Sequence, residues 1–123
     1  MDEYFGKLIV EYSLTNGGMK LMHEKILNLI IAQAEELNEQ LEIIIPVELG
    51  ADAPLFGGKT GVLSSISLVT LIVAVEQSIE DEFETSLILA DEKAMSQKNS
   101  PFLTIGSLTN YIIMLLNEDA PND

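Results

Sequence analysis

The chain of 123 residues contains no cysteine, no arginine and no tryptophan, and its one histidine is His23. The absence of cysteine excludes disulfides and thiolate metal ligands. The single histidine, His23, leaves no histidine cluster for the chemistry of a metal centre or of a catalytic triad. We therefore expect no bound metal.

Basic residues are also scarce. The chain has six lysines but 20 aspartates and glutamates, which gives a net charge of −14. Nucleic acid binding requires clusters of Lys or Arg, and an anionic membrane surface would repel this chain. No apolar stretch reaches the about 18 residues of a membrane-spanning helix. The first residues, Met1-Asp2-Glu3, are acidic where a signal peptide would be basic. We expect a cytoplasmic protein, with no nucleic acid partner and no membrane insertion.

The length indicates one domain, and the apolar fraction of 47% argues against wholesale disorder. Residues 1–18 stand apart as an N-terminal extension, expected to be flexible, because Asn16-Gly17-Gly18 is a typical breaker. Residues 19–118 form the expected helical domain, and residues 119–123 an acidic tail.

The spacing of apolar residues predicts an all-α fold with helices near 20–42, 65–83, 91–97 and 104–117. Thr104 is the expected cap of the last helix. Between the first two helices lies a long connection, from Glu42 to Leu63, rich in Pro and Gly. A connection of this length within a compact domain is usually functional. Leu55 and Phe56 are expected to pin it to the core.

The most informative motif is Ser64-Ser65-Ile66, at the junction between this connection and the second helix. An apolar run, 68–75, follows it, and an acidic helix end begins at Glu76. This arrangement resembles the attachment site of acyl carrier proteins over about residues 20–117. The resemblance implies a four-helix carrier bundle in which Ser65 bears a covalent 4′-phosphopantetheine arm from coenzyme A.

The sequence departs from the family pattern at three positions. Ser64 stands where the family usually has Asp, while Ser67 and Thr70 stand at commonly acidic positions. Ser64 and Ser67 are rival hydroxyls, but only Ser65 keeps the family's spacing to Val69 and Glu76. The simpler alternative is that a serine here only caps the helix.

The resemblance also implies a docking surface. Ile66 and Val73 would contact a partner enzyme, with core packing as the alternative, and Glu76 and Glu80 would meet its basic residues, with a solvated face as the alternative. The implied partners are a phosphopantetheinyl transferase and acyl-transferring or synthase enzymes with basic docking faces. The carrier itself would be a monomer and would catalyse nothing.

We therefore predict a stand-alone acyl or aminoacyl carrier that delivers thioesters to separate enzymes. Fatty-acid, polyketide, aminoacyl and specialised lipid or sugar pathways are all compatible with it. One alternative is an arm-free helical adaptor of the same fold that binds basic proteins. A third reading is a nucleotide-binding protein, because Ala53–Thr60 loosely matches a phosphate-binding loop. That motif requires a strand directly before the loop and a helix starting at Lys59-Thr60. Residues 41–47 could be this strand and residues 113–116 a second one, but Val47 lies six positions before Ala53, and Gly61 interrupts the start of the helix.

Overall fold

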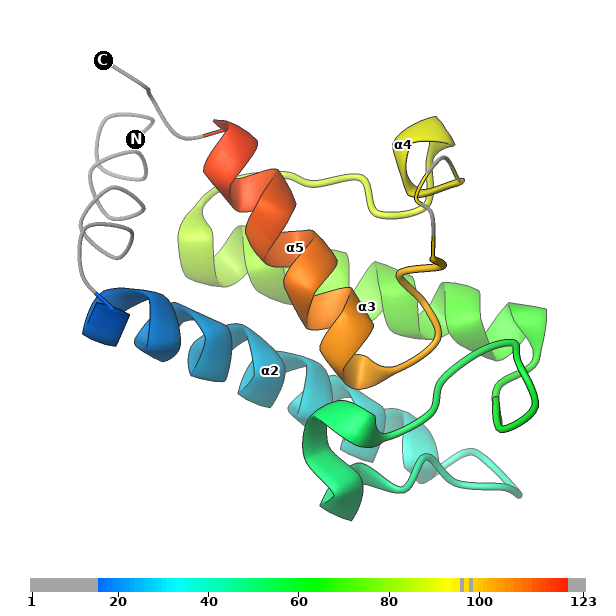
Figure 1. The fold of residues 1–123 in the computed structure, drawn as a ribbon. Coiled ribbons are helices and arrows are strands. Elements are labelled where there is room, and N and C mark those ends of the chain that lie inside the picture. The colour runs from blue at the N-terminus through cyan, green and yellow to red at the C-terminus, as the bar shows by residue number, and fades with distance from the viewer. Residues whose placement is uncertain (1–15, 96, 98, 120–123) are drawn as a thin grey trace.

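The computed structural model describes residues 16–95, 97 and 99–119 (Figure 1). Within these residues the chain is helical and contains no strand, which confirms the all-α prediction. The elements in chain order are α2 (Asn16–Asn38), the 3-10 helix η1 (Val47–Asp52), α3 (Ser65–Phe83), α4 (Glu92–Met95) and α5 (Ile105–Asp119).

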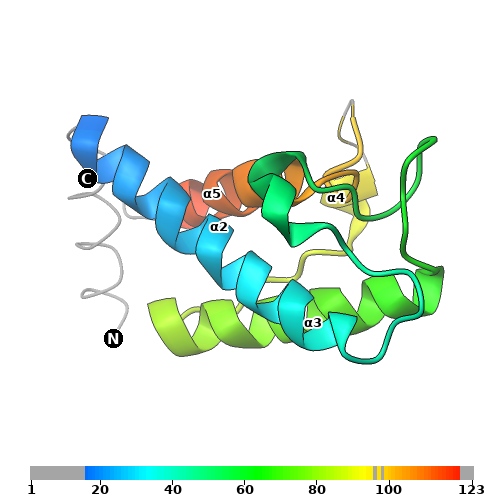
Figure 2. The same ribbon diagram turned by 90° about the horizontal axis from the view of Figure 1, so that it is seen from below.

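The helix α2 is the centre of the packing, because it contacts α3, α5 and η1, while η1 also contacts α5. Seen from below, α2 runs obliquely, and its C-terminal end lies over the middle of α3 (Figure 2). Each of α2 and α3 turns one apolar stripe inward, mostly at a spacing of three or four residues. The buried residues of α2 are Met22, Ile26, Ile30, Ala34 and Leu37, and those of α3 are Leu68, Leu71, Ile72, Val75, Ile79 and Phe83.

α2 ends at Asn38, four residues before the predicted end at Glu42. The side chain of Asn38 explains this, because it accepts a hydrogen bond from Ile45 N at 2.7 Å and donates one to Ile45 O at 2.9 Å. Such side-chain bonds to the backbone compete with helix continuation. They turn the chain back and place Ile45 in the core, where it is fully buried.

The start of α2 corrects a second prediction. Asn16, Gly17 and Gly18 lie inside the helix, so the expectation that they break the chain is wrong. The boundary expected after residue 18 falls within α2, and residues 1–15 lie outside the described part. At the other end, α5 runs to Asp119, the first residue of the expected tail, and residues 120–123 are not described. α4 is shorter than the predicted segment 91–97.

The long connection is held to the core at Leu55, which is fully buried, as expected. Its backbone N–H donates to Leu103 O at 2.8 Å, and its carbonyl accepts from Val62 N and Leu63 N, each at 2.9 Å. Between these contacts the chain makes a tight turn closed by Gly61 N and Gly57 O at 3.1 Å. A Cβ at Gly61 would lie 2.5 Å from Gly57 N and O, so this turn requires glycine there.

The 3-10 helix η1 was not predicted and forms within this connection. It packs closely against α5. A Cβ on Gly106 of α5 would be only 2.9 Å from Ala51 O of η1. In the described part of the chain, no helix combines the length and the apolar character that crossing a membrane requires.

Candidate attachment site at the start of α3

Ser64 is the N-cap of α3. Its backbone is extended, with φ −74° and ψ 168°, and its hydroxyl oxygen accepts a hydrogen bond from Ser67 N at 3.1 Å. The same hydroxyl donates to Ser67 Oγ, also at 3.1 Å. Ser64 therefore performs the capping role that the simpler alternative assigned to this motif.

Ser65, the first residue of α3, differs from both neighbouring serines. Its side chain is exposed, and its hydroxyl has no hydrogen-bond partner among the described residues. Ser67 is half-buried and already accepts the Ser64 hydroxyl. Of the three hydroxyls, Ser65 is thus the one that is both accessible and uncommitted.

The backbone around Ser65 suits a negatively charged substituent. Ser67 N is capped by Ser64, and Leu68 N donates to Ser64 O at 2.9 Å, which leaves the N–H groups of Ser65 and Ile66 without acceptors in the described structure. Free N–H groups and the helix dipole favour an anion at such an end. The first turn of α3 contains no acidic residue that would repel it. These residues fit the phosphodiester of a phosphopantetheine arm on Ser65.

Both apolar residues of the expected docking surface lie outside the core. Ile66 is 81% exposed and Val73 is 58% exposed, so core packing does not explain either residue. Val69, which is 57% exposed, lies between them on the same face. We call Ile66, Val69 and Val73 the α3 stripe. Val69 was missed in this role, although its spacing from the other two placed it on their face.

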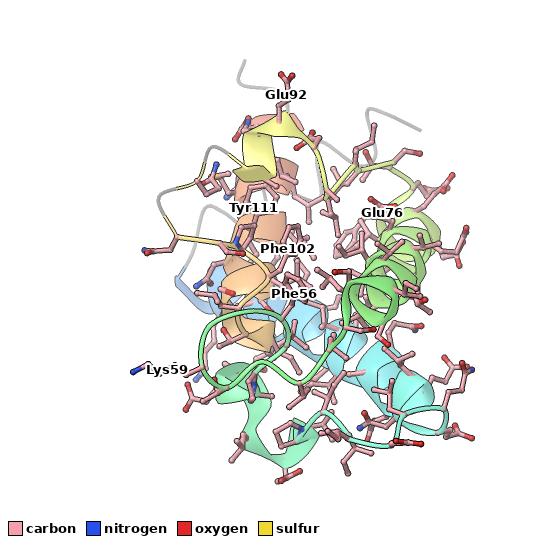
Figure 3. The ribbon with its side chains drawn as sticks, turned by 90° about the vertical axis from the view of Figure 1, so that its right-hand side faces the viewer. Phe56, Lys59, Glu76, Glu92, Phe102 and Tyr111 are labelled. Atoms are coloured by element: carbon pink, nitrogen blue, oxygen red, sulfur yellow. The ribbon has the colours of Figure 1, made fainter. Side chains whose placement is uncertain are left out.

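The two acidic residues of the expected docking surface differ. Glu80 is exposed, as a contact residue would be. Glu76 is half-buried, and its Oε2 accepts a hydrogen bond from Leu89 N at 2.8 Å. Its carboxylate therefore tethers the connection after α3. Figure 3 labels Glu76 on α3. A docking role for Glu76 stays a prediction beside this structural role.

The segment that resembles a phosphate-binding loop has a different geometry. Lys59 points outward from the glycine turn, and α3 does not begin until Ser65, five residues after Thr60 (Figure 3). Residues 41–46 are irregular, and residues 112–116 belong to α5. The strand that this motif requires before the loop is replaced by irregular chain and by η1, and the helix that it requires at Lys59-Thr60 is replaced by a turn.

Among the described residues, no group of three or more His, Cys, Asp and Glu side chains could hold a metal ion.

Tyr111 is buried, and its hydroxyl has no hydrogen-bond partner in the described structure. Burial raises the pKa of Tyr111 above the ordinary 10.0.

Comparison of the sequence with family models finds no match, and neither the curated proteins nor the solved structures provide one. The resemblance to acyl carrier proteins therefore rests on the residues of the motif and their spacing.

Proposed function

We propose that the protein is a stand-alone carrier that holds acyl or aminoacyl thioesters on a 4′-phosphopantetheine arm at Ser65. The observation that carries this proposal is the exposed, uncommitted hydroxyl of Ser65 at the start of α3. The neighbouring serines are engaged with each other, so the motif presents one hydroxyl to a transferase.

The chain's own residues would position the arm and present it. Ser64 and Ser67 hold the first turn of α3, and the free N–H groups at that turn favour the phosphodiester. The arm, when bound, supplies the thiol that carries the cargo as a thioester. Docking then raises the effective concentration of the cargo at the partner enzyme.

The carrier-type four-helix bundle belongs to the same proposal. Its support is the order of the elements, with three longer helices, a short helix before the last and a long first connection. The α3 stripe and the exposed Glu80 would dock the carrier on synthases and transferases with basic faces. A cytoplasmic location is part of the same proposal.

The test is transfer of the arm by a broad-specificity phosphopantetheinyl transferase with coenzyme A, followed by intact mass measurement. The unmodified chain is expected to gain the mass of one arm. Ser65→Ala should gain none, because no other hydroxyl has both access and the helix-end N–H groups. Ser67→Ala should still be modified.

Ser64→Ala needs a stability control, because losing the N-cap should lower the free energy of unfolding by about 1 kcal/mol. Urea unfolding of all three variants separates this loss from a failure of transfer. Ser64→Ala should accept the arm under all conditions in which urea unfolding shows that it is folded. Continued modification of Ser65→Ala would refute the assignment.

The arm-free adaptor is the second candidate, and the α3 stripe favours it equally, because exposed apolar residues can dock a partner without an arm. If several transferases leave the folded, unmutated chain unmodified, the adaptor is the better description.

A further inference from the structure

The chain turns back on itself directly after α2, between residues 39 and 49 (Figure 1). Three large apolar side chains of this turn are more than half exposed, at 68% for Ile43, 56% for Ile44 and 53% for Leu49. We call these three residues the elbow patch. The other exposed large apolar residues outside the α3 stripe stand singly in the described chain: Leu21, Ile88 and Leu103. Single exposed apolar residues are common on protein surfaces, whereas a cluster of them indicates an interaction site.

The turn is held in one conformation by hydrogen bonds at its base. The side chain of Asn38 bonds to both backbone groups of Ile45. Val47 N donates to Ile45 O at 2.8 Å, and Leu49 N donates to Pro46 O at 3.0 Å. These bonds keep Leu49 within one tight turn of the Ile43-Ile44 pair. The patch is therefore preorganised, which lowers the conformational entropy that binding would cost.

The packing of the chain itself does not explain the Ile43-Ile44 pair. Ile45, the next residue, is fully buried and anchors the turn to the core. The peptide groups of Ile43 and Ile44 have no hydrogen-bond partner in the described structure. Two adjacent apolar side chains and their unpaired peptide groups are thus presented to solvent on a fixed support.

The charged residues of this stretch are all acidic. Glu42 adjoins Ile43, Glu48 adjoins Leu49, and both carboxylates are exposed. The chain has no basic residue between Lys25 and Lys59. A complementary surface must therefore bring Lys or Arg beside its apolar part. A second copy of this chain, with net charge −14, would instead place carboxylates against carboxylates.

We propose that the elbow patch is a separate binding surface for a partner protein that offers an apolar pocket bordered by Lys or Arg. Ile43 and Ile44 enter the pocket as adjacent anchors, and Leu49 packs at its edge. Glu42 and Glu48 face the basic residues of the border. A few buried anchors within a polar rim supply most of the binding energy in interfaces of this kind.

This surface differs from the docking surface proposed for acyl transfer. The α3 stripe lies on α3, after Ser65, whereas the elbow patch lies in the turn between α2 and η1. Binding at the elbow patch requires no arm, so Ser65→Ala should bind this partner as tightly as the unmutated chain. A failure of the arm-transfer experiment would leave the elbow proposal intact, and the reverse also holds.

The first test replaces Ile43 in the full-length protein by the photo-crosslinking residue p-benzoylphenylalanine. The same replacement at Ile88 is the control for a single exposed apolar site, and that at Val69 reports on the α3 stripe. Each protein is illuminated in an extract of the cells that naturally contain the chain, and mass spectrometry identifies the crosslinked products. A protein is expected to crosslink from position 43 and from neither of the other two positions.

Four results of this test would overturn the proposal. If no protein crosslinks specifically from position 43, nothing docks on the elbow patch. A crosslink to the chain itself would show that a second copy occupies it, and a crosslink to lipid would show a membrane surface. The same protein crosslinked from positions 43 and 69 would make the elbow patch part of the α3 docking surface.

The second test measures the affinity of the identified protein, after purification, for full-length variants at about 0.15 M salt, where charge attraction is screened beyond about 8 Å. Ile43→Ser with Ile44→Ser should weaken binding by at least about tenfold, corresponding to about 1.4 kcal/mol. Leu21→Ser with Ile88→Ser removes two exposed apolar side chains elsewhere, and should weaken binding by less than about twofold.

The charged border has its own matched pair. Glu42→Lys with Glu48→Lys should weaken binding by about tenfold. Glu24→Lys with Glu92→Lys makes the same charge change at exposed sites outside the patch, and should weaken binding by less than about threefold. The urea midpoints of the elbow variants should stay close to that of the unmutated chain, because the replaced side chains are exposed. Equal effects within either matched pair would refute the assignment.

Discussion

At the scale of single residues, Tyr111 is a buried side chain whose hydroxyl lacks a partner in the described structure. An unpaired buried hydroxyl costs free energy because it has lost its hydrogen bonds to water. Tyr111→Phe should therefore match or exceed the unmutated protein in stability, by up to about 1 kcal/mol in urea unfolding at neutral pH. A lower free energy of unfolding for Tyr111→Phe than for the unmutated protein would mean that the hydroxyl has a partner, such as a bound water.

The same side chain links stability to alkaline pH. Burial raises the pKa of Tyr111 in the folded protein above the ordinary 10.0. Above this pH the unfolded chain loses the phenol proton while the folded chain keeps it, so the free energy of unfolding falls as pH rises toward the folded pKa. Tyr111→Phe should lack this part of the decline. Parallel pH profiles for the two proteins would contradict the expectation.

At the scale of elements, one hydrogen bond joins α3 to the connection that leads to α4. Glu76 Oε2 accepts from Leu89 N at 2.8 Å, and Leu89 is fully buried. Glu76→Ala should leave this N–H unpaired and lower the free energy of unfolding by about 2 kcal/mol. Hydrogen exchange at the Leu89 amide should become faster, which amide-resolved NMR can measure.

Two other substitutions isolate this effect. Glu80→Ala removes an exposed carboxylate four residues further along α3, and should change stability by less than about 0.5 kcal/mol. Glu76→Gln keeps an oxygen acceptor and should fall between Glu76→Ala and the unmutated protein. If the exchange rate of Leu89 is the same in all of them, the tether does not stabilise the connection.

At the scale of the whole molecule, the net charge of −14 makes the folded chain repel itself. Added salt screens this repulsion, with a screening length of about 10 Å at 0.1 M. The urea midpoint should therefore rise as sodium chloride increases from about 0.02 to about 0.2 M. Glu24→Lys with Glu92→Lys changes the net charge by +4, from −14 to −10, and should show a smaller rise. A midpoint independent of salt in both proteins would contradict this.

The elements differ in how far local sequence predicted them. α3 spans Ser65–Phe83, as predicted, because its serine cap and unbroken apolar run are signals within the helix itself. The end of α2 was predicted four residues late, because it depends on Asn38 meeting Ile45, which is seven residues away. η1 escaped prediction because its position depends on close contact with α5.

The residues of the candidate site also differ in how far the sequence predicted their roles. The motif placed Ser65 at the start of a helix, and the family's spacing favoured it over Ser64 and Ser67. The hydrogen bonds between Ser64 and Ser67 add that their hydroxyls are engaged while that of Ser65 is not. Glu76 and Glu80 looked alike, yet Glu76 turns toward Leu89 while Glu80 faces solvent. The hydrogen-bond partners of these side chains could not be inferred from their order in the chain.

The sequence by itself determined the all-α character, the extent of α3 and the acidic sign of the surface, because each of these follows from residues that are close neighbours or from a simple sum of charges. Only the tertiary structure decided that Glu76 is tethered to Leu89 and that α2 crosses the middle of α3. Periodicity specifies which residues share a face of one helix. Where two helices cross depends on how many distant side chains pack together.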